Sequence, residues 1–186
     1  TVAALGLSRP HMPFKGLIMA ILISPMIVPL IITAAGMFFF YSKLGLTHSY
    51  TGLILAHTAL GTPFVVITVT ATLTGFDNNL IRESQSLGGD TMRTFFKVIM
   101  PLILPGVISG ALFAFITSFD EVVVVLFVGS VEQVTIPRQM WAGLRQEISP
   151  VILCMATCLV ALSIALLTTV ELLRRRSERL RGIKNR

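Results

Sequence analysis

The sequence predicts an all-α, polytopic bundle of transmembrane helices. Hydrophobic residues make up 54% of the chain and charged residues only 13%, against roughly a quarter charged in soluble domains. The charges are also segregated, so several apolar runs reach the ~20 residues that cross a hydrocarbon core. We expect about four full spans in one transmembrane domain of residues 1–186, preceded by the end of a truncated span in residues 1–8.

The first two complete runs lie between residues 15 and 43 and between residues 48 and 77. Pro25 and Pro29 predict that the first run is bent, because proline frees backbone carbonyls inside a span. The second run is rich in threonine, a weak sign of a polar path. Its one ionisable group, His57, is either a satisfied histidine facing the bundle or a proton relay.

The segment Arg82–Pro101 carries both signs of charge and still has helical periodicity. Asp77 and Asp90 can each cap a short helix, and the Gly-Gly pair at 88–89 can stop the first one. We therefore predict two short amphipathic helices bent at the Gly-Gly pair, within residues 77–101. They form either a docking element or an ordinary loop on the membrane surface.

The third run extends from Lys97 to Asp120 and onward to Gly129. Small residues recur along it at every fourth position, and such a stripe lets another helix approach closely. We assign three residues of the stripe to helix packing: Gly106, Gly110 and Ala114. Pro105 fits the first turn of this helix.

Two acids follow the small-residue stripe. Intramembrane carboxylates are costly unless they face a cavity or a partner, so they indicate function. We predict a substrate pathway that includes four consecutive residues: Ser118, Phe119, Asp120 and Glu121. Alternatively, the acids mark the outer end of the span, and residues 122–128 re-enter the membrane or lie flat.

The remaining elements are an outer segment, a fourth run and a tail. Residues 130–148 contain a short amphipathic helix, Arg138–Ile148, whose Trp141 suits a membrane interface. Residues 150–170 read as a packing helix. Seven basic residues follow in the tail, residues 174–186.

Orientation follows from the basic residues. One side holds Arg9, Lys15, Arg82, Arg93, Lys97 and the tail, and the other holds only Lys43, Arg138 and Arg145. Since the richer side is cytoplasmic, we expect residues 77–101 and 174–186 in the cytoplasm and residues 130–148 outside. This distribution explains the positive charge, and no nucleic acid partner is expected.

Catalytic chemistry has no candidate in the sequence. There is no Walker A loop, no nucleophile–base arrangement and no metal cluster. Cys154 and Cys158 share a helix face without a further Cys or His nearby, so apolar filling is the preferred interpretation. We expect no catalytic residue, metal or cofactor in this chain; where ATP is used, another subunit supplies it.

Residues 82–101 resemble the cytoplasmic signature of the permease subunits of bacterial binding-protein-dependent ABC importers. The signature reads Glu-Ala-Ala, three residues, Gly, nine residues, Ile, any residue and Leu-Pro. Gly88 takes the Gly position, Val98 the Ile position and Met100-Pro101 the Leu-Pro positions. Arg82-Glu83-Ser84 stands in place of Glu-Ala-Ala, so the acidic residue is displaced by one.

Further stretches are similar to the spermidine/putrescine branch of this family, particularly to its second permease subunit. They are residues 8–17, 24–32, 62–77 and 118–129, so the resemblance covers nearly the whole chain in order. The family has six spans, which implies that this chain lacks the first and most of the second.

The resemblance implies a mechanism and a set of partners. The helices around Gly88 would dock in a cleft of a cytoplasmic ATPase that forms a homodimer and holds ATP and Mg²⁺. A second permease subunit, a periplasmic or lipid-anchored substrate-binding protein and the lipid of the bacterial inner membrane would complete the system. The residues implied in ATPase coupling are Arg82, Glu83, Ser84, Gln85, Leu87, Gly88, Gly89 and Pro101.

The function expected on these grounds is import of a small cationic solute, such as spermidine or putrescine, by alternating access through a non-catalytic permease subunit. The same importer class with a different small solute is the first alternative. A proton-driven secondary transporter using His57 and the acids is a second, and a structural or sensory scaffold is a third.

Overall fold

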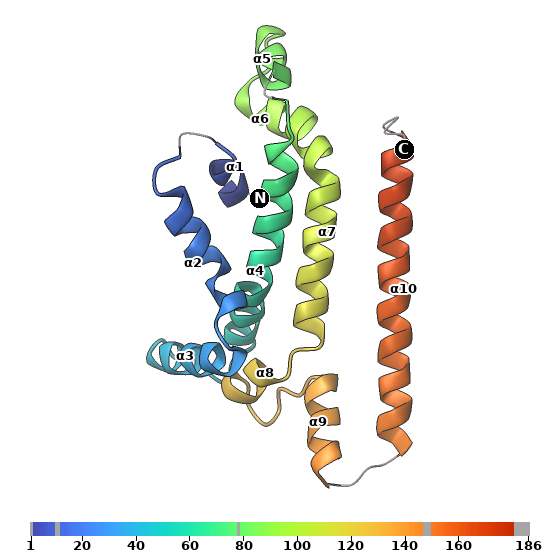
Figure 1. Cartoon of the computed structure of the whole chain (residues 1–186). Helices are drawn as coiled ribbons and strands as arrows, with labels where there is room; N and C mark the ends of the chain where they lie inside the picture. The colour runs from blue at the N-terminus through green and yellow to red at the C-terminus, as the bar shows by residue number, and fades with distance from the viewer. Residues whose placement is uncertain (1, 10–11, 78, 147–149, 181–186) are drawn as a thin grey trace.

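The fold is seen in a computed structural model, which describes residues 2–9, 12–77, 79–146 and 150–180. Every regular element in these ranges is helical, as predicted (Figure 1). In chain order the elements are α1 (Val2–Leu7), α2 (Lys15–Ile27), α3 (Leu30–Lys43), α4 (Tyr50–Thr74), α5 (Asn79–Ser86), α6 (Thr91–Thr94), the π-helical turn η1 (Phe95–Ile99), α7 (Met100–Phe119), α8 (Val123–Val128), α9 (Ile136–Gln146) and α10 (Pro150–Leu180).

The centre of the fold is the pair α4 and α7, which lie side by side along the long axis (Figure 1). Gly106 and Gly110 lie so close to threonine hydroxyls of α4 that neither position has room for a Cβ. A Cβ added to Gly61 of α4 would lie only 2.9 Å from the Cβ of Ala114. The small-residue stripe of α7 therefore faces α4 and sets the distance between the two helices.

The first apolar run is not one straight span. Its two halves, α2 and α3, are bent by 106°, and α3 lies across the end of α4 (Figure 1). The break falls at Val28 and Pro29, both with extended backbone, because Pro29 has no N–H to continue the ladder of α2. Three described helical stretches are long and apolar enough to cross a membrane, or four if the bent pair counts as one span.

The prediction of two separate short helices in residues 77–101 is wrong in its second half. Thr91–Phe119 forms one helical stretch of 29 residues through α6, η1 and α7. Within it the N–H of Met100 donates to the carbonyl of Phe95, which gives the wider π turn just before Pro101. Pro105 consequently lies inside the helix and not in its first turn.

The predicted ends of the short helix α5 are confirmed. Asp77 accepts a backbone N–H from its first turn, and Asp90 does the same for α6. Gly88 has a φ of 80°, and the N–H of Gly89 donates to the carbonyl of Ser84 at 2.9 Å. This arrangement closes a helix and requires the left-handed conformation that glycine adopts readily.

At the end of the fold opposite α5, α8 turns back against the bundle after α7 ends at Phe119 (Figure 1). Val124, Val125 and Val128 are fully buried against α3 and α4. Residues 123–128 are therefore a short helix packed into the protein rather than a straight continuation of α7.

The last two helices differ in their bounds from the predicted ones. α9 begins two residues before the predicted Arg138, and the predicted last residue, Ile148, lies outside the described residues. α10 continues as a helix into the predicted tail and reaches Leu180, while residues 181–186 lie outside the described part. None of its apolar span is buried within this chain, so the prediction of a packing helix stays a prediction.

Candidate solute cavity and coupling segment

A cavity of about 910 Å³ lies between α4, α7 and the loop that leads into α9. Its wall is mostly apolar, with a minority of hydroxyl and ionisable groups. The polar groups among the lining residues are Tyr50, His57, Thr58, Thr62, Ser118, Glu132, Gln133 and Thr135. Such a mixture is typical of a site for a small solute.

The α4 side of the cavity is a single helix face. Tyr50, Ile54, Thr58 and Thr62 follow one another at intervals of four residues, which places them in one row along the helix. The hydroxyl of Thr62 donates to the carbonyl of Thr58 at 2.7 Å. The threonines are thus held by their own helix, and their oxygens keep capacity to accept a further hydrogen bond.

His57 and Ser118 join the two sides of the cavity. The Nδ1 atom of His57 on α4 lies 2.9 Å from the Oγ atom of Ser118 on α7. Both side chains are half-buried and both line the cavity. Of the four predicted pathway residues, Ser118 and Phe119 line this cavity.

The two predicted acids are not brought together. Glu121 is only 5% exposed, and its Oε1 atom accepts the N–H of Val124 at 2.7 Å, which caps the start of α8. Asp120 is exposed and lines a second, almost wholly apolar groove of about 470 Å³ between α7, α9 and α10. Phe119 lines both hollows, so the groove that Asp120 lines is next to the cavity.

A first prediction concerns Glu121 as a capping residue. We expect Glu121→Ala to lower the free energy of unfolding by about 1–2 kcal/mol, because it leaves the buried N–H of Val124 without an acceptor. Glu121→Gln should lower the free energy of unfolding less, because its amide oxygen can still accept the hydrogen bond from the N–H of Val124. Thermal unfolding of the purified protein in detergent measures the difference, with the exposed neighbour variant Asp120→Asn as control. Equal stability of Glu121→Ala and the parent would refute the capping role.

The acid that does line the cavity is Glu132, which the sequence analysis missed. It belongs to the loop between α8 and α9, whose shape is held by Arg138. The guanidinium Nη1 donates to the carbonyls of Ser130 at 2.6 Å and Gln133 at 2.9 Å. A loop has no periodicity that would place its side chains in a cavity. The one feature of the sequence that could have indicated this site is the acid Glu132 with the basic Arg138 six positions later.

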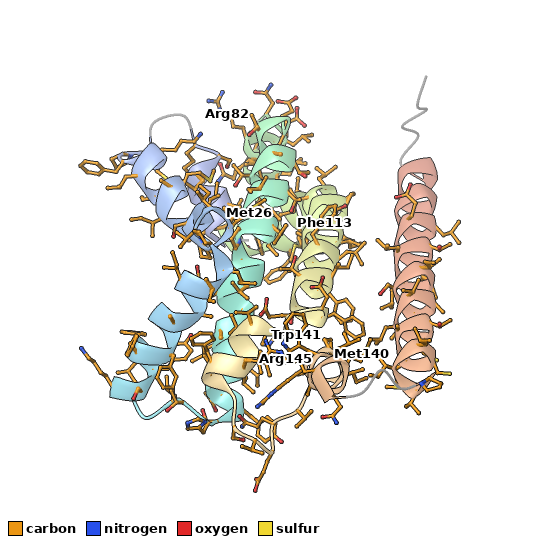
Figure 2. The ribbon with its side chains drawn as sticks, turned by 60° about the horizontal axis from the view of Figure 1, so that its bottom comes forward. Met26, Arg82, Phe113, Met140, Trp141 and Arg145 are labelled. Carbon is orange, nitrogen blue, oxygen red and sulfur yellow. The ribbon has the colours of Figure 1, made fainter. Side chains whose placement is uncertain are left out.

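The predicted coupling segment lies at the other end of the long axis. Arg82 on α5 marks that end, whereas Met140, Trp141 and Arg145 gather around α9 at the cavity end (Figure 2). Arg145 stacks over the Trp141 ring, 5.5 Å from its centroid. The C-terminal end of α10 lies on the side of α5 (Figure 1).

Several of the residues implied in coupling are exposed on α5 or directly after it. Arg82, Glu83, Gln85 and Leu87 are exposed, Leu87 to 89%, and Arg82, Glu83 and Leu87 border a shallow hollow. Pro101 is separate from them, because it lies ten residues along the continuous helix from Thr91, about 15 Å away along the axis.

A hydrogen bond between two hydroxyl groups links α5 to the helical stretch Thr91–Phe119. The Oγ atom of Ser84 lies 2.9 Å from the Oγ1 atom of Thr94, which is 2% exposed. Gly89 packs so tightly here that an added Cβ would lie 2.7 Å from the carbonyl oxygen of Ser84. These contacts link α5 to α6, which continues through η1 into α7.

Metal and thiol chemistry receive no support in the described ranges. No group of three or more His, Cys, Asp or Glu side chains is arranged to hold a metal ion in those ranges. Cys154 and Cys158 are exposed free thiols on α10, so neither fills space inside this chain, and their interpretation as apolar filling stays a prediction.

Comparison with known proteins shows that the chain is similar to membrane components of transport systems. The family model for the binding-protein-dependent transport system inner membrane component matches residues 1–179. The spermidine/putrescine transport system permease protein PotC of Haemophilus influenzae is 30% identical over 176 residues, which cover 95% of this chain and 68% of that protein. PotC of Escherichia coli is 29% identical over 175 residues, or 94% of this chain and 66% of that protein. The putrescine transport system permease protein PotI of Escherichia coli is 30% identical over 106 residues, 57% of this chain and 38% of that protein. The chain spans about two thirds of the length of both PotC relatives.

Proposed function

Because the chain belongs to the family of binding-protein-dependent transport system inner membrane components, we propose that it is the permease subunit of an ATP-driven importer for a polyamine such as spermidine or putrescine. As a multi-pass member of this family it is a transport subunit of the inner membrane and not an enzyme. The names of its relatives, two PotC proteins and PotI, support the polyamine as solute.

The observation that carries the proposal is the cavity between α4, α7 and the outer loop. A polyamine is a flexible chain of methylene groups that carries ammonium charges. The mostly apolar wall suits the methylene groups, and Tyr50 and Phe119 offer aromatic faces to the ammonium groups. Glu132 supplies a carboxylate in the wall, and Asp120 supplies another beside it.

The proposed coupling runs along the long axis of the fold. The exposed face of α5 would dock on a cytoplasmic ATPase, and closure of two such subunits around ATP would push α5. The Ser84–Thr94 hydrogen bond supports transmission of this push to α7, which lines the cavity. A second permease subunit and a substrate-binding protein on the outer side would complete the importer, with α5 and the basic tail in the cytoplasm.

Uptake of labelled spermidine by the reconstituted complex tests the solute assignment. We expect Glu132→Gln and Asp120→Asn each to raise the KM about fivefold, the effect of about 1 kcal/mol from a partly solvated charge pair. Arg145→Gln, which changes a charge at the same end outside the cavity, is the control. Unchanged KM values in the double acid variant would remove both acids from the pathway.

Two further measurements separate the alternatives. Competition by unlabelled solutes distinguishes a polyamine from another small solute carried by the same importer class. Uptake that survives ATP depletion but is lost with the proton gradient would identify a secondary transporter instead.

A further inference from the structure

The His57–Ser118 pair has a feature that the transport proposal leaves unused. The imidazole has two nitrogens, and only Nδ1 is engaged, by the hydroxyl of Ser118. No residue of the described chain makes a hydrogen bond with Nε2. The buried side-chain polar atoms that lack a partner in the described part are the hydroxyls of Thr33 and Thr70. Nε2 is therefore not sealed inside the protein, and His57 lines the cavity.

We infer that His57 is a solute-binding residue whose Nε2 atom accepts a hydrogen bond from an ammonium group of the cationic solute, while Ser118 fixes the ring. The inference rests on the proposed function and deepens it. An ammonium group has only donors, so its partner must present a lone pair. A neutral imidazole presents that lone pair on one nitrogen and carries a proton on the other.

Ser118 makes the required tautomer possible. When the solute donates to Nε2, the ring proton sits on Nδ1 and is donated to the Oγ atom of Ser118. A serine hydroxyl can accept as well as donate, so the pair adapts to the empty and the occupied cavity without moving. Because Ser118 already holds the ring, the histidine side chain loses less conformational entropy when the solute binds.

The surroundings of His57 favour a cation that extends along α4. The row of Tyr50, Thr58 and Thr62 lies on the same side of the helix and lines the same cavity. Hydroxyl oxygens held in this row can accept from further N–H groups of the solute. Glu121, whose carboxylate caps the start of α8, also acts electrostatically on His57, and a negative charge near the ring favours a bound cation.

The competing explanation is that His57 only links α4 to α7. Two isosteric substitutions separate the roles, because asparagine places a polar atom near Nδ1 and glutamine places one near Nε2. Spermidine uptake by the complete complex is the assay. We expect His57→Asn to raise the KM about tenfold with Vmax retained, corresponding to about 1.4 kcal/mol. His57→Gln should keep the KM within about twofold, because a hydrogen-bond acceptor remains in the cavity.

Thermal stabilisation of the purified complex by spermidine gives a second readout that needs no turnover. The shift in the unfolding temperature should be lost in His57→Asn and kept in His57→Gln. The reverse pattern, with His57→Asn like the parent and His57→Gln impaired, would show that the histidine is only an interhelical link. If His57→Asn keeps the parental KM and the parental shift in unfolding temperature, that result alone overturns the inference. A parent complex that neither takes up nor is stabilised by any polyamine would instead overturn the proposed function.

Discussion

Gly110→Leu should abolish accumulation of folded protein. An added Cβ at this position would lie 2.9 Å from the Cα of Val65 and closer still to the hydroxyl of Thr68. That hydroxyl cannot turn away freely, because it donates to the carbonyl of Phe64 at 2.8 Å. A leucine would therefore force α4 and α7 apart along their whole contact, which costs about 3 kcal/mol or more. Monodisperse protein recovered in mild detergent measures the effect.

Gly36→Leu is the matched control for this prediction. Gly36 is also inside an apolar helix, α3, but an added Cβ there would meet nothing within 4 Å. Both substitutions replace a helical glycine with a better helix former, so the comparison isolates the packing between α4 and α7. Normal recovery of Gly110→Leu would show that the two helices do not pack through the small-residue stripe.

Local features of the fold were predictable from the sequence. The caps at Asp77 and Asp90 and the stop at Gly88 depend on residues within one helical turn, and the structure contains all of them. The small-residue stripe is equally local in origin, since spacing alone places its members on one helix face.

Features set by distant contacts were harder to predict. The proline pair predicted a bend between α2 and α3 but not one of 106°, because the angle depends on what α3 packs against. Continuity through η1 was missed because Pro105 was placed in the first turn of a new helix, where proline is common, although the helical stretch begins at Thr91. The two acids differ although they are adjacent: the turn into α8 buries Glu121 and leaves Asp120 exposed. Glu132 lines the cavity from a loop that hydrogen bonds from Arg138 hold, and such a loop follows no helical periodicity.

The coupling segment provides the second prediction with a large expected effect. A Cβ at Gly89 would lie 2.7 Å from the carbonyl oxygen and 2.8 Å from the hydroxyl of Ser84. Gly89→Val should therefore displace Ser84 and break its hydrogen bond with Thr94. The exposed face of α5 would remain available to an ATPase, but its link to the helix that leads into α7 would be lost. We expect the rate of spermidine uptake to fall at least about tenfold, which corresponds to a free-energy change of about 1.4 kcal/mol. The complex should continue to hydrolyse ATP.

Gly75→Ala is the control for this experiment, because Gly75 lies at the same end of the molecule and an added Cβ there would come no closer than 3.9 Å to another atom. Copurification with the ATPase then decides what α5 does. If Gly89→Val copurifies and hydrolyses ATP but does not transport, the fastening between α5 and α7 transmits the motion. If the variant transports at the parental rate, the Ser84–Thr94 contact has no part in coupling. If the variant no longer binds the ATPase, the valine has changed the shape of α5. In that case α5 is a docking surface, and the loss of transport does not come from the broken Ser84–Thr94 contact.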